Sequence, residues 1–117
     1  MENVKPITEI DIIMLSYSHN EELKQMTENA IRSLIDSEDA NKIKFNIILI
    51  ESEKKLKPYQ YPNTTTIYPN QVFGYHRYMN VGIRMTKARY VCLCNNDLYF
   101  HKFSLAYICL ILYPFHL

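Results

Sequence analysis

Residues 10–15 read IDIIML, a nearly continuous apolar run close to the start of the chain. Such a run is typical of a strand that is covered on both faces, as strands are in a parallel sheet. A second run of the same kind, FNIILI, occupies residues 45–50. We therefore predict that both segments are buried strands of one sheet.

A helix is predicted between the two strands, over residues 21–35. Its apolar residues recur at the spacing of one helical face, namely Leu23, Met26, Ala30, Ile31, Leu34 and Ile35. The polar residues SYSHN separate the first strand from this helix, and either Asn20 or Ser18 is expected to cap it. Glu21 and Glu22 follow, where negative charge suits the helix dipole.

The second half of the chain continues the alternation of strands and helices. TTTIY at residues 64–68 is rich in β-branched side chains and predicts a short strand. Residues 75–87 predict a helix, and YVCLC at residues 90–94 predicts a further strand. Residues 53–63 are expected to form a loop or a short helix, and a last helix is expected from residue 103 to Pro114.

The whole pattern predicts a single α/β domain over residues 1–117. We expect a Rossmann-like layered fold with a mostly parallel central sheet of about four strands flanked by helices. A length of 117 residues, with 48% apolar and 21% charged residues, suits one small globular domain. The net charge of +1 and the lack of a long basic run argue against binding to nucleic acid.

The ends of the chain and its cysteines bear on location. The opening residues MENVKPITEI are too polar for a signal peptide, and Cys92, Cys94 and Cys109 are expected to be buried, reduced thiols, so we predict a cytoplasmic protein. The tail at residues 103–117, FSLAYICLILYPFHL, is shorter than the roughly 20 apolar residues of a spanning helix. Three places for this tail stay open: the core, an interface with another subunit, and the surface of a membrane.

Polar clusters follow three of the predicted strands directly. They are SYSHN at residues 16–20, ESE at residues 51–53 and NND at residues 95–97. Because parallel strands end at the same edge of a sheet, and ligands of such sheets bind beyond that edge, the three clusters are expected to converge on one binding site.

These segments, in this order, resemble the N-terminal, nucleotide-sugar-binding half of family 2 glycosyltransferases of the GT-A fold. DIIMLSYSHN, IILIESE, GYHRYMNVGI and YVCLCNNDLYF carry the resemblance, which covers about residues 10–100. It implies a GT-A-type fold that is incomplete at its C-terminus, with residues 101–117 as an apolar tail. It also implies transfer of a sugar from a nucleoside-diphosphate sugar to an acceptor that is a glycan, a lipid or a protein.

The resemblance assigns a role to several residues of the nucleotide site. Glu51 is expected to accept hydrogen bonds from the base, with Ser16 and Tyr17 beside it. Asn80 is expected to approach the nucleotide from the second helix, together with Arg77 or, as a weaker choice, His76.

Asn95, Asn96 and Asp97 resemble the DXD-type motif of the family in an asparagine-rich form. Asp97 and Asn95 are then expected to hold Mn²⁺ or Mg²⁺ on the diphosphate, and Asn96 to bind the nucleotide. The family more often has aspartate at the first of these positions, so Asn95 implies weaker metal binding. Alternatively, Asp97 is a helix cap or turn residue, and Glu51 is a solvated loop residue paired with Lys54 or Lys55.

The catalytic base is missing from this pattern. Inverting members of the family take an aspartate or glutamate from the acceptor-binding half, and this chain has no Asp or Glu after Asp97. A truncated gene product, a fragment, or a site completed by another subunit each fits. Two further hypotheses stand beside the glycosyltransferase: a non-catalytic nucleotide- or partner-binding α/β module, and a flavodoxin- or receiver-type domain. The receiver version is disfavoured because SYSHN has no carboxylate.

Overall fold

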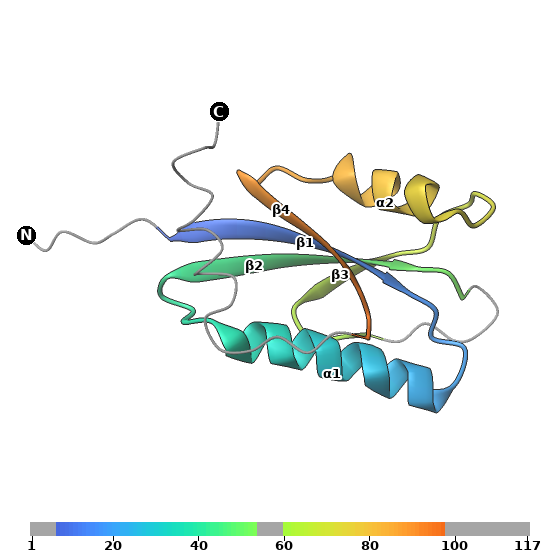
Figure 1. The fold of residues 1–117 in the computed structure, drawn as a ribbon, viewed down its shortest axis with the longest axis horizontal. Coiled ribbons are helices and arrows are strands. Elements are labelled where there is room, and N and C mark those ends of the chain that lie inside the picture. The colour runs from blue at the N-terminus through green and yellow to red at the C-terminus, as the bar shows by residue number, and fades with distance from the viewer. Residues whose placement is uncertain (1–6, 54–59, 98–117) are drawn as a thin grey trace, which may run out of the picture.

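A computed structural model of the chain describes residues 7–53 and 60–97, and the predicted α/β fold is confirmed there (Figure 1). The elements are β1 (Thr8–Ser16), α1 (Glu21–Ser37), β2 (Ile43–Glu51), β3 (Thr64–Ile67), α2 (Tyr75–Ile83) and β4 (Tyr90–Asn95). The predicted helix from residue 103 and the tail lie outside the described residues, as does Cys109. Neither described helix has the length and apolar character that crossing a membrane requires.

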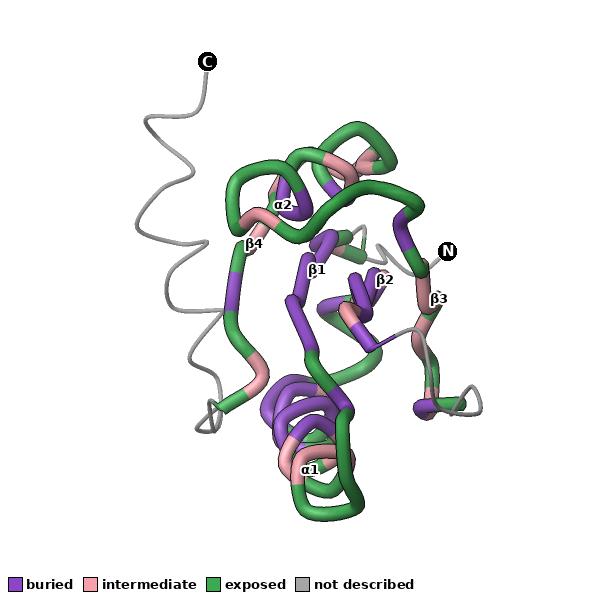
Figure 2. Tube along the Cα trace, turned by 90° about the vertical axis from the view of Figure 1, so that its right-hand side faces the viewer, coloured by how far each residue is buried: buried purple, intermediate pink, exposed green. Residues whose placement is uncertain are grey.

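The sheet has four strands in the order β3-β2-β1-β4, and every pair is parallel. Helix α1 covers one face of the sheet and α2 covers the other, so the described chain forms three layers (Figure 1). Figure 2 looks onto the carboxyl ends of the strands and shows buried stretches in β1 and β2, between the two helices, and in α1.

The apolar run of β1 divides between the two faces. Ile10, Ile12 and Met14 pack against α1, whereas Ile13 and Leu15 pack against α2. Because successive side chains of a strand point to opposite faces, a strand buried on both sides has to be apolar at almost every position. The composition of residues 10–15 therefore follows directly from the three-layer arrangement.

Helix α1 begins where the sequence predicts. The side chain of Asn20 accepts a hydrogen bond from the backbone N–H of Leu23 at 2.9 Å, so Asn20 and not Ser18 is the cap. This bond satisfies a backbone donor that the first turn of a helix leaves unpaired.

Helix α2 is shorter than predicted, because it ends at Ile83 and not at residue 87. The reason lies in Asp11, a β1 residue that is 3% exposed. Its Oδ2 accepts hydrogen bonds from the backbone N–H groups of Lys87 (2.7 Å) and Ala88 (3.0 Å), and its Oδ1 accepts one from the Asn46 amide at 2.8 Å. Asp11 thus captures the chain after α2 and directs it into β4.

Strand β4 lies at an edge of the described sheet, and its two faces differ. Cys94 is buried and Cys92 is half-buried, and both pack on the α1 side as free thiols, so the predicted burial is complete only for Cys94. Val91 and Leu93, on the other face, are 42% and 50% exposed. Helix α2 therefore covers the centre of the sheet and not this edge.

Gly82 allows α2 to approach β1 closely. A Cβ at this position would lie 2.5 Å from Cγ2 of Ile13, a β-branched side chain with little freedom to move. A contact this close should cost about 2–3 kcal/mol in overpacking, of which the better helix propensity of alanine offsets roughly 1 kcal/mol, so Gly82→Ala should lower the free energy of unfolding by about 1–2 kcal/mol. Urea denaturation measures this difference.

Gly74→Ala is the matched control for that substitution, since its Cβ would lie 3.5 Å from Cβ of Arg77, an ordinary contact. Gly74 is the N-cap of α2, where alanine is less favourable than glycine, so this variant should lose only about 0.5 kcal/mol. Equal stability of the two variants would contradict the close contact between α2 and β1.

Asp11 should also make stability depend on pH. Burial acts to raise its pKa, but hydrogen bonds from Ala88, Asn46 and Lys87 outweigh burial and leave the pKa below the ordinary value of 3.8. The carboxylate therefore contributes its full stabilisation above that value and loses it as the pH falls through the lowered pKa.

Asp11→Asn should then cost about 1–3 kcal/mol at pH 7, because its backbone donors lose a charged acceptor. The variant should also lose less stability than the unmodified chain when the pH falls below about 4. Denaturation curves at several pH values test this, with the exposed α1 residue Asp36 changed to Asn as the control. Parallel pH profiles for the unmodified chain and Asp11→Asn would contradict it.

Candidate functional site

The polar clusters that follow β1, β2 and β4 lie at one edge of the sheet. In the register of the strands, Ser16 is paired with Glu51 and Leu15 is paired with Asn95. The chain therefore leaves β1, β2 and β4 at nearly the same height. Figure 2 views this edge from outside, with β4, β1, β2 and β3 from left to right.

The strand order reverses between β1 and β4. From β1 the chain passes through α1 to β2 on one side, and after β3 it crosses the opposite face through α2 to reach β4 on the other side of β1 (Figure 1). The loops at such a point lead away in opposite directions and leave a crevice between them, where open α/β sheets bind their ligands.

A pocket of about 260 Å³ opens at this reversal point. It is lined by Leu15, Ser16, Tyr17, Ser52, Phe73, Tyr75, Asn95, Asn96 and Asp97. Of the residues that the sequence assigns to a site, the pocket thus brings together Ser16, Tyr17, Asn95, Asn96 and Asp97. Phe73 and Tyr75, which precede and begin α2, were not predicted as site residues.

The aromatic residues of the pocket expose much of their surface. Tyr17 is 49% exposed, Phe73 58% and Tyr75 48%, so Tyr17 is not a core residue. Solvent-exposed aromatic rings beside a polar floor offer flat apolar surface to a ligand, and planar rings stack on such surfaces.

Tyr17 stacks on His19, with ring centroids 5.2 Å apart and planes 5° from parallel. His19 Nδ1 lies 2.8 Å from Oε2 of Glu53, whose side chain is only 7% exposed. A buried carboxylate therefore holds the imidazole, and the imidazole supports the Tyr17 ring. His19 and Glu53 belong to the SYSHN and ESE clusters, but the sequence assigns them no role.

Glu51 does not line the pocket. It is 3% exposed, and its Oε2 accepts hydrogen bonds at 2.9 Å from the backbone N–H groups of Ser18 and Glu53. Its other oxygen, Oε1, is buried and has no hydrogen-bond partner in the described part of the chain. Glu51 is therefore no solvated loop residue, because it ties the loop after β1 to the loop after β2.

A chain of hydroxyl groups lies behind the pocket. Ser16 Oγ is 3.0 Å from Ser18 Oγ and 3.1 Å from Thr27 Oγ1, and Ser18 Oγ also bonds to the Tyr61 hydroxyl. Asn96 Nδ2 donates to Thr27 Oγ1 at 2.9 Å. Burial raises the pKa of Tyr61 above its ordinary value, so this hydroxyl stays protonated.

Thr27 and Tyr61 were not predicted as members of this network. One signal was present for Thr27, because it stands on the apolar face of the predicted helix, between Leu23 and Ala30 or Ile31. A hydroxyl at such a position needs a buried partner.

The predicted residues of α2 point elsewhere. Arg77 is exposed, and its Nη1 donates a hydrogen bond to the Val72 carbonyl at 2.7 Å, which closes the loop before the helix. Asn80 and His76 are exposed as well, and neither lines the pocket. Tyr75, at the first position of α2, is the helix residue that reaches the pocket.

Asp97 and Asn95 are the residues predicted to hold a metal ion, and both line the pocket beside Asn96. Within residues 7–53 and 60–97, no group of three or more His, Cys, Asp or Glu side chains is placed to hold a metal. One exposed carboxylate with neighbouring amides fits a Mg²⁺ or Mn²⁺ ion that takes its other ligands from substrate phosphates and water. It does not fit a closed metal site made by protein alone.

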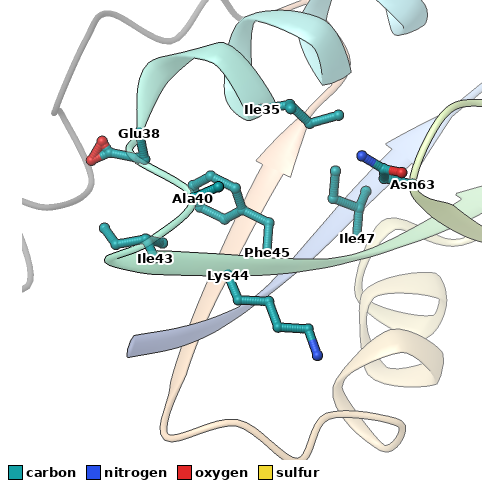
Figure 3. A pocket seen from close by; sticks show the side chains of 8 residues that line it. All are labelled: Ile35, Glu38, Ala40, Ile43, Lys44, Phe45, Ile47 and Asn63. Atoms are coloured by element: carbon teal, nitrogen blue, oxygen red, sulfur yellow. The ribbon is translucent and has the colours of Figure 1, made fainter. Parts of the chain in front are cut away.

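A larger cavity of about 370 Å³ lies at the opposite end, beside the end of α1 and the start of β2. Ile35, Ala40, Ile43, Phe45 and Ile47 form most of its walls. Figure 3 shows the charged ends of Glu38 and Lys44 directed away from these apolar side chains. Because polar groups do not converge there, the cavity lacks the features of a catalytic or polar-ligand site.

No model of a protein family matches the chain, and no curated protein matches it either. The likeness to family 2 glycosyltransferases therefore stays a prediction from the four motifs.

Glu51→Ala should destabilise the loops that frame the pocket. Removing the carboxylate leaves the buried N–H groups of Ser18 and Glu53 without their acceptor, at a cost of roughly 1–3 kcal/mol in the free energy of unfolding. Chemical denaturation measures the loss.

The control for this substitution is Glu9→Ala. Glu9 is an exposed carboxylate of β1, and its Oε1 lies 3.7 Å from Nζ of Lys44. A surface pair of this kind contributes at most about 1 kcal/mol. If Glu51→Ala proved no less stable than Glu9→Ala, Glu51 would not hold the two loops together.

Proposed function

We propose that the chain binds a nucleoside-diphosphate sugar in the pocket between β1 and β4, as the donor-binding half of a family 2-like glycosyltransferase. The observation that carries the proposal is the meeting of Tyr17 with Asn95, Asn96 and Asp97 in one pocket at the reversal point of the sheet. A flat, apolar surface and a metal-compatible carboxylate are the two features that a base and a diphosphate require.

The base is proposed to stack on Tyr17, whose ring is already supported by His19. Asp97 and Asn95 would hold Mn²⁺ or Mg²⁺ against the diphosphate, and a bound metal neutralises the charge that grows on the phosphates as the sugar leaves. Asn96 donates through Nδ2 to Thr27, so its Oδ1 is the atom left to accept from the nucleotide.

The other residues predicted to contact the nucleotide, Glu51, Arg77 and Asn80, do not line the pocket. A direct bond from Glu51 to the base would use Oε1, the oxygen without a partner among the described residues. Arg77 does not line the pocket and its Nη1 is engaged with the Val72 carbonyl, so a contact with the diphosphate would require its side chain to move. Asn80 is exposed on α2 and does not line the pocket, so its contact with the nucleotide has no support from its position.

A second candidate function is a non-catalytic nucleotide- or partner-binding module. Among the described residues that line the pocket, Asp97 is the only carboxylate, and the proposal assigns it to the metal. Transfer of the sugar to an acceptor hydroxyl in the inverting manner needs a general base as well. Donor binding is therefore the part of the reaction that we propose for these residues.

Calorimetric titration of UDP and GDP, each with and without Mn²⁺, tests the proposal. We expect binding that strengthens about tenfold or more with Mn²⁺ in the unmodified chain and loses this gain in Asp97→Ala, because metal ligands and their partners typically contribute tenfold to a hundredfold. Asp36→Ala, an exposed carboxylate of α1, should bind as the unmodified chain does.

The outcomes separate the two functions. Nucleotide binding that neither Mn²⁺ nor Asp97→Ala affects would overturn the metal role of Asp97. A chain that binds neither nucleotide would overturn the donor site and favour the partner-binding module. Release of UDP from a UDP-sugar in the presence of acceptor extracts would add catalysis to binding.

A further inference from the structure

We infer that Thr27, buried in α1, is a positioning residue of the pocket, because its hydroxyl fixes the Asn96 side chain and thereby presents Asn95 and Asp97 to a metal–diphosphate group. This inference rests on the proposed donor site and concerns a residue that makes no contact with the ligand. It assigns a role in binding to a hydroxyl that a fold of this kind does not otherwise require.

The position of Thr27 calls for an apolar side chain. It is 0% exposed and lies on the face of α1 that packs on the sheet, near Ala30, Ile31 and Leu34 of the core. A buried hydroxyl costs free energy unless its donor and acceptor capacity is used. Its presence here therefore has to be explained by its partners.

The hydrogen bonds of Thr27 account for its whole capacity. A threonine hydroxyl has one hydrogen to donate and two lone pairs. Thr27 Oγ1 lies 3.2 Å from the Leu23 carbonyl and 3.1 Å from Ser16 Oγ, and it accepts from Asn96 Nδ2 at 2.9 Å. Donation to Leu23 and acceptance from Ser16 and Asn96 leaves nothing unpaired.

The hydrogen bond between Asn96 and Thr27 lies just beyond the last paired residue of β4. Pairing between β1 and β4 ends at Leu15 and Asn95, and Asn96 and Asp97 form a turn beyond it. The Asn96 side chain crosses from this turn to α1, a separation of 69 residues in sequence. The turn that carries Asp97 is thus anchored by a side chain to a helix on the face of the sheet.

The same hydroxyl chain links the turn to the β1 side of the pocket. Ser16 lines the pocket and bonds to Thr27, and Ser18 and Tyr61 continue the chain. Ser16 and Asn96 both line the pocket, and the side chains of both form hydrogen bonds with the same atom, Thr27 Oγ1. Fixing ligand groups before binding lowers the entropy cost of binding, and outer partners of metal ligands act in this way.

The test compares Thr27→Val with Thr27→Ser. Valine keeps the shape and removes the hydroxyl, whereas serine keeps the hydroxyl and its three hydrogen bonds. We expect Thr27→Val to weaken UDP binding in the presence of Mn²⁺ by about tenfold or more, the usual size of effects from outer partners of metal ligands. Thr27→Ser should keep most of the affinity of the unmodified chain. Binding of UDP without Mn²⁺ is proposed to rely mainly on stacking on Tyr17, with Asn96 as a minor contact, so Thr27→Val should weaken it much less than the binding with Mn²⁺.

Ser33→Ala is the matched control, because it removes another buried hydroxyl of α1, one that bonds to the Ala30 carbonyl away from the pocket. A merely structural role of Thr27 would lower stability in both variants and leave the ratio of affinities with and without Mn²⁺ unchanged. That ratio is therefore the deciding quantity. An unchanged ratio in Thr27→Val overturns the inference.

A second measurement serves if Thr27→Val does not fold. In the unmodified chain, the bond to Thr27 should protect the Asn96 side-chain amide protons from exchange with water, and NMR detects this. An Asn96 amide that exchanges as fast as those of exposed asparagines overturns the inference. If the unmodified chain shows no Mn²⁺-dependent binding, the proposed donor site and the role of Thr27 are both overturned. If the unmodified chain binds and Thr27→Val has an unchanged ratio, only the role of Thr27 is overturned.

Discussion

The burial of β1 on all sides is the constraint on which the rest of the structure depends. Its faces are covered by α1 and α2, and its edges are paired with β2 and β4. From Ile10 to Ser16 the strand is buried, so apolar side chains fill most of it and polar groups gather where it ends. The pocket stands at the carboxyl end of β1 for this reason, between the loops that β1 and β4 send in opposite directions.

Buried polar groups hold both ends of the central strand. At the amino end, Asp11 accepts three hydrogen bonds and fixes the entry into β4. At the carboxyl end, Glu51 joins the loops after β1 and β2, and Thr27 joins the turn after β4 to α1. Each group replaces water with donors or acceptors from distant segments, and so the loops around the pocket gain fixed positions that short polar loops lack by themselves.

The strands and α1 could be predicted from the sequence because they obey periodic patterns. The apolar runs of β1 and β2 and the helical spacing from Leu23 to Ile35 arise from burial on defined faces, and Asn20 caps through a local bond to Leu23. The gathering of polar clusters at one edge follows from parallel pairing. These features depend on neighbours in sequence or on the geometry common to all parallel sheets.

Side-chain partners distant in sequence could not be predicted in this way. No pattern in the sequence indicates that Asp11 would end α2 at Ile83 by capturing Lys87 and Ala88, 76 and 77 residues away. Phe73 and Tyr75 enter the pocket through the path of the loop before α2, which depends on tertiary packing. The buried faces of helices and strands follow from local sequence patterns, whereas the hydrogen-bond partners of single side chains depend on the complete fold.

The character of the pocket limits the chemistry that its residues perform. Its lining combines aromatic rings, amides and hydroxyls with Asp97 as the one carboxylate among the described residues. A carboxylate that is exposed and flanked by amides is suited to share a cation with an anionic ligand, since it has too few negative neighbours to retain that cation alone. Metal and diphosphate would then bind together, and the affinity for each would depend on the other. Under the proposed donor-binding role, such a site would select a metal-bound diphosphate, and an acceptor would have to be activated by groups other than those that line this pocket.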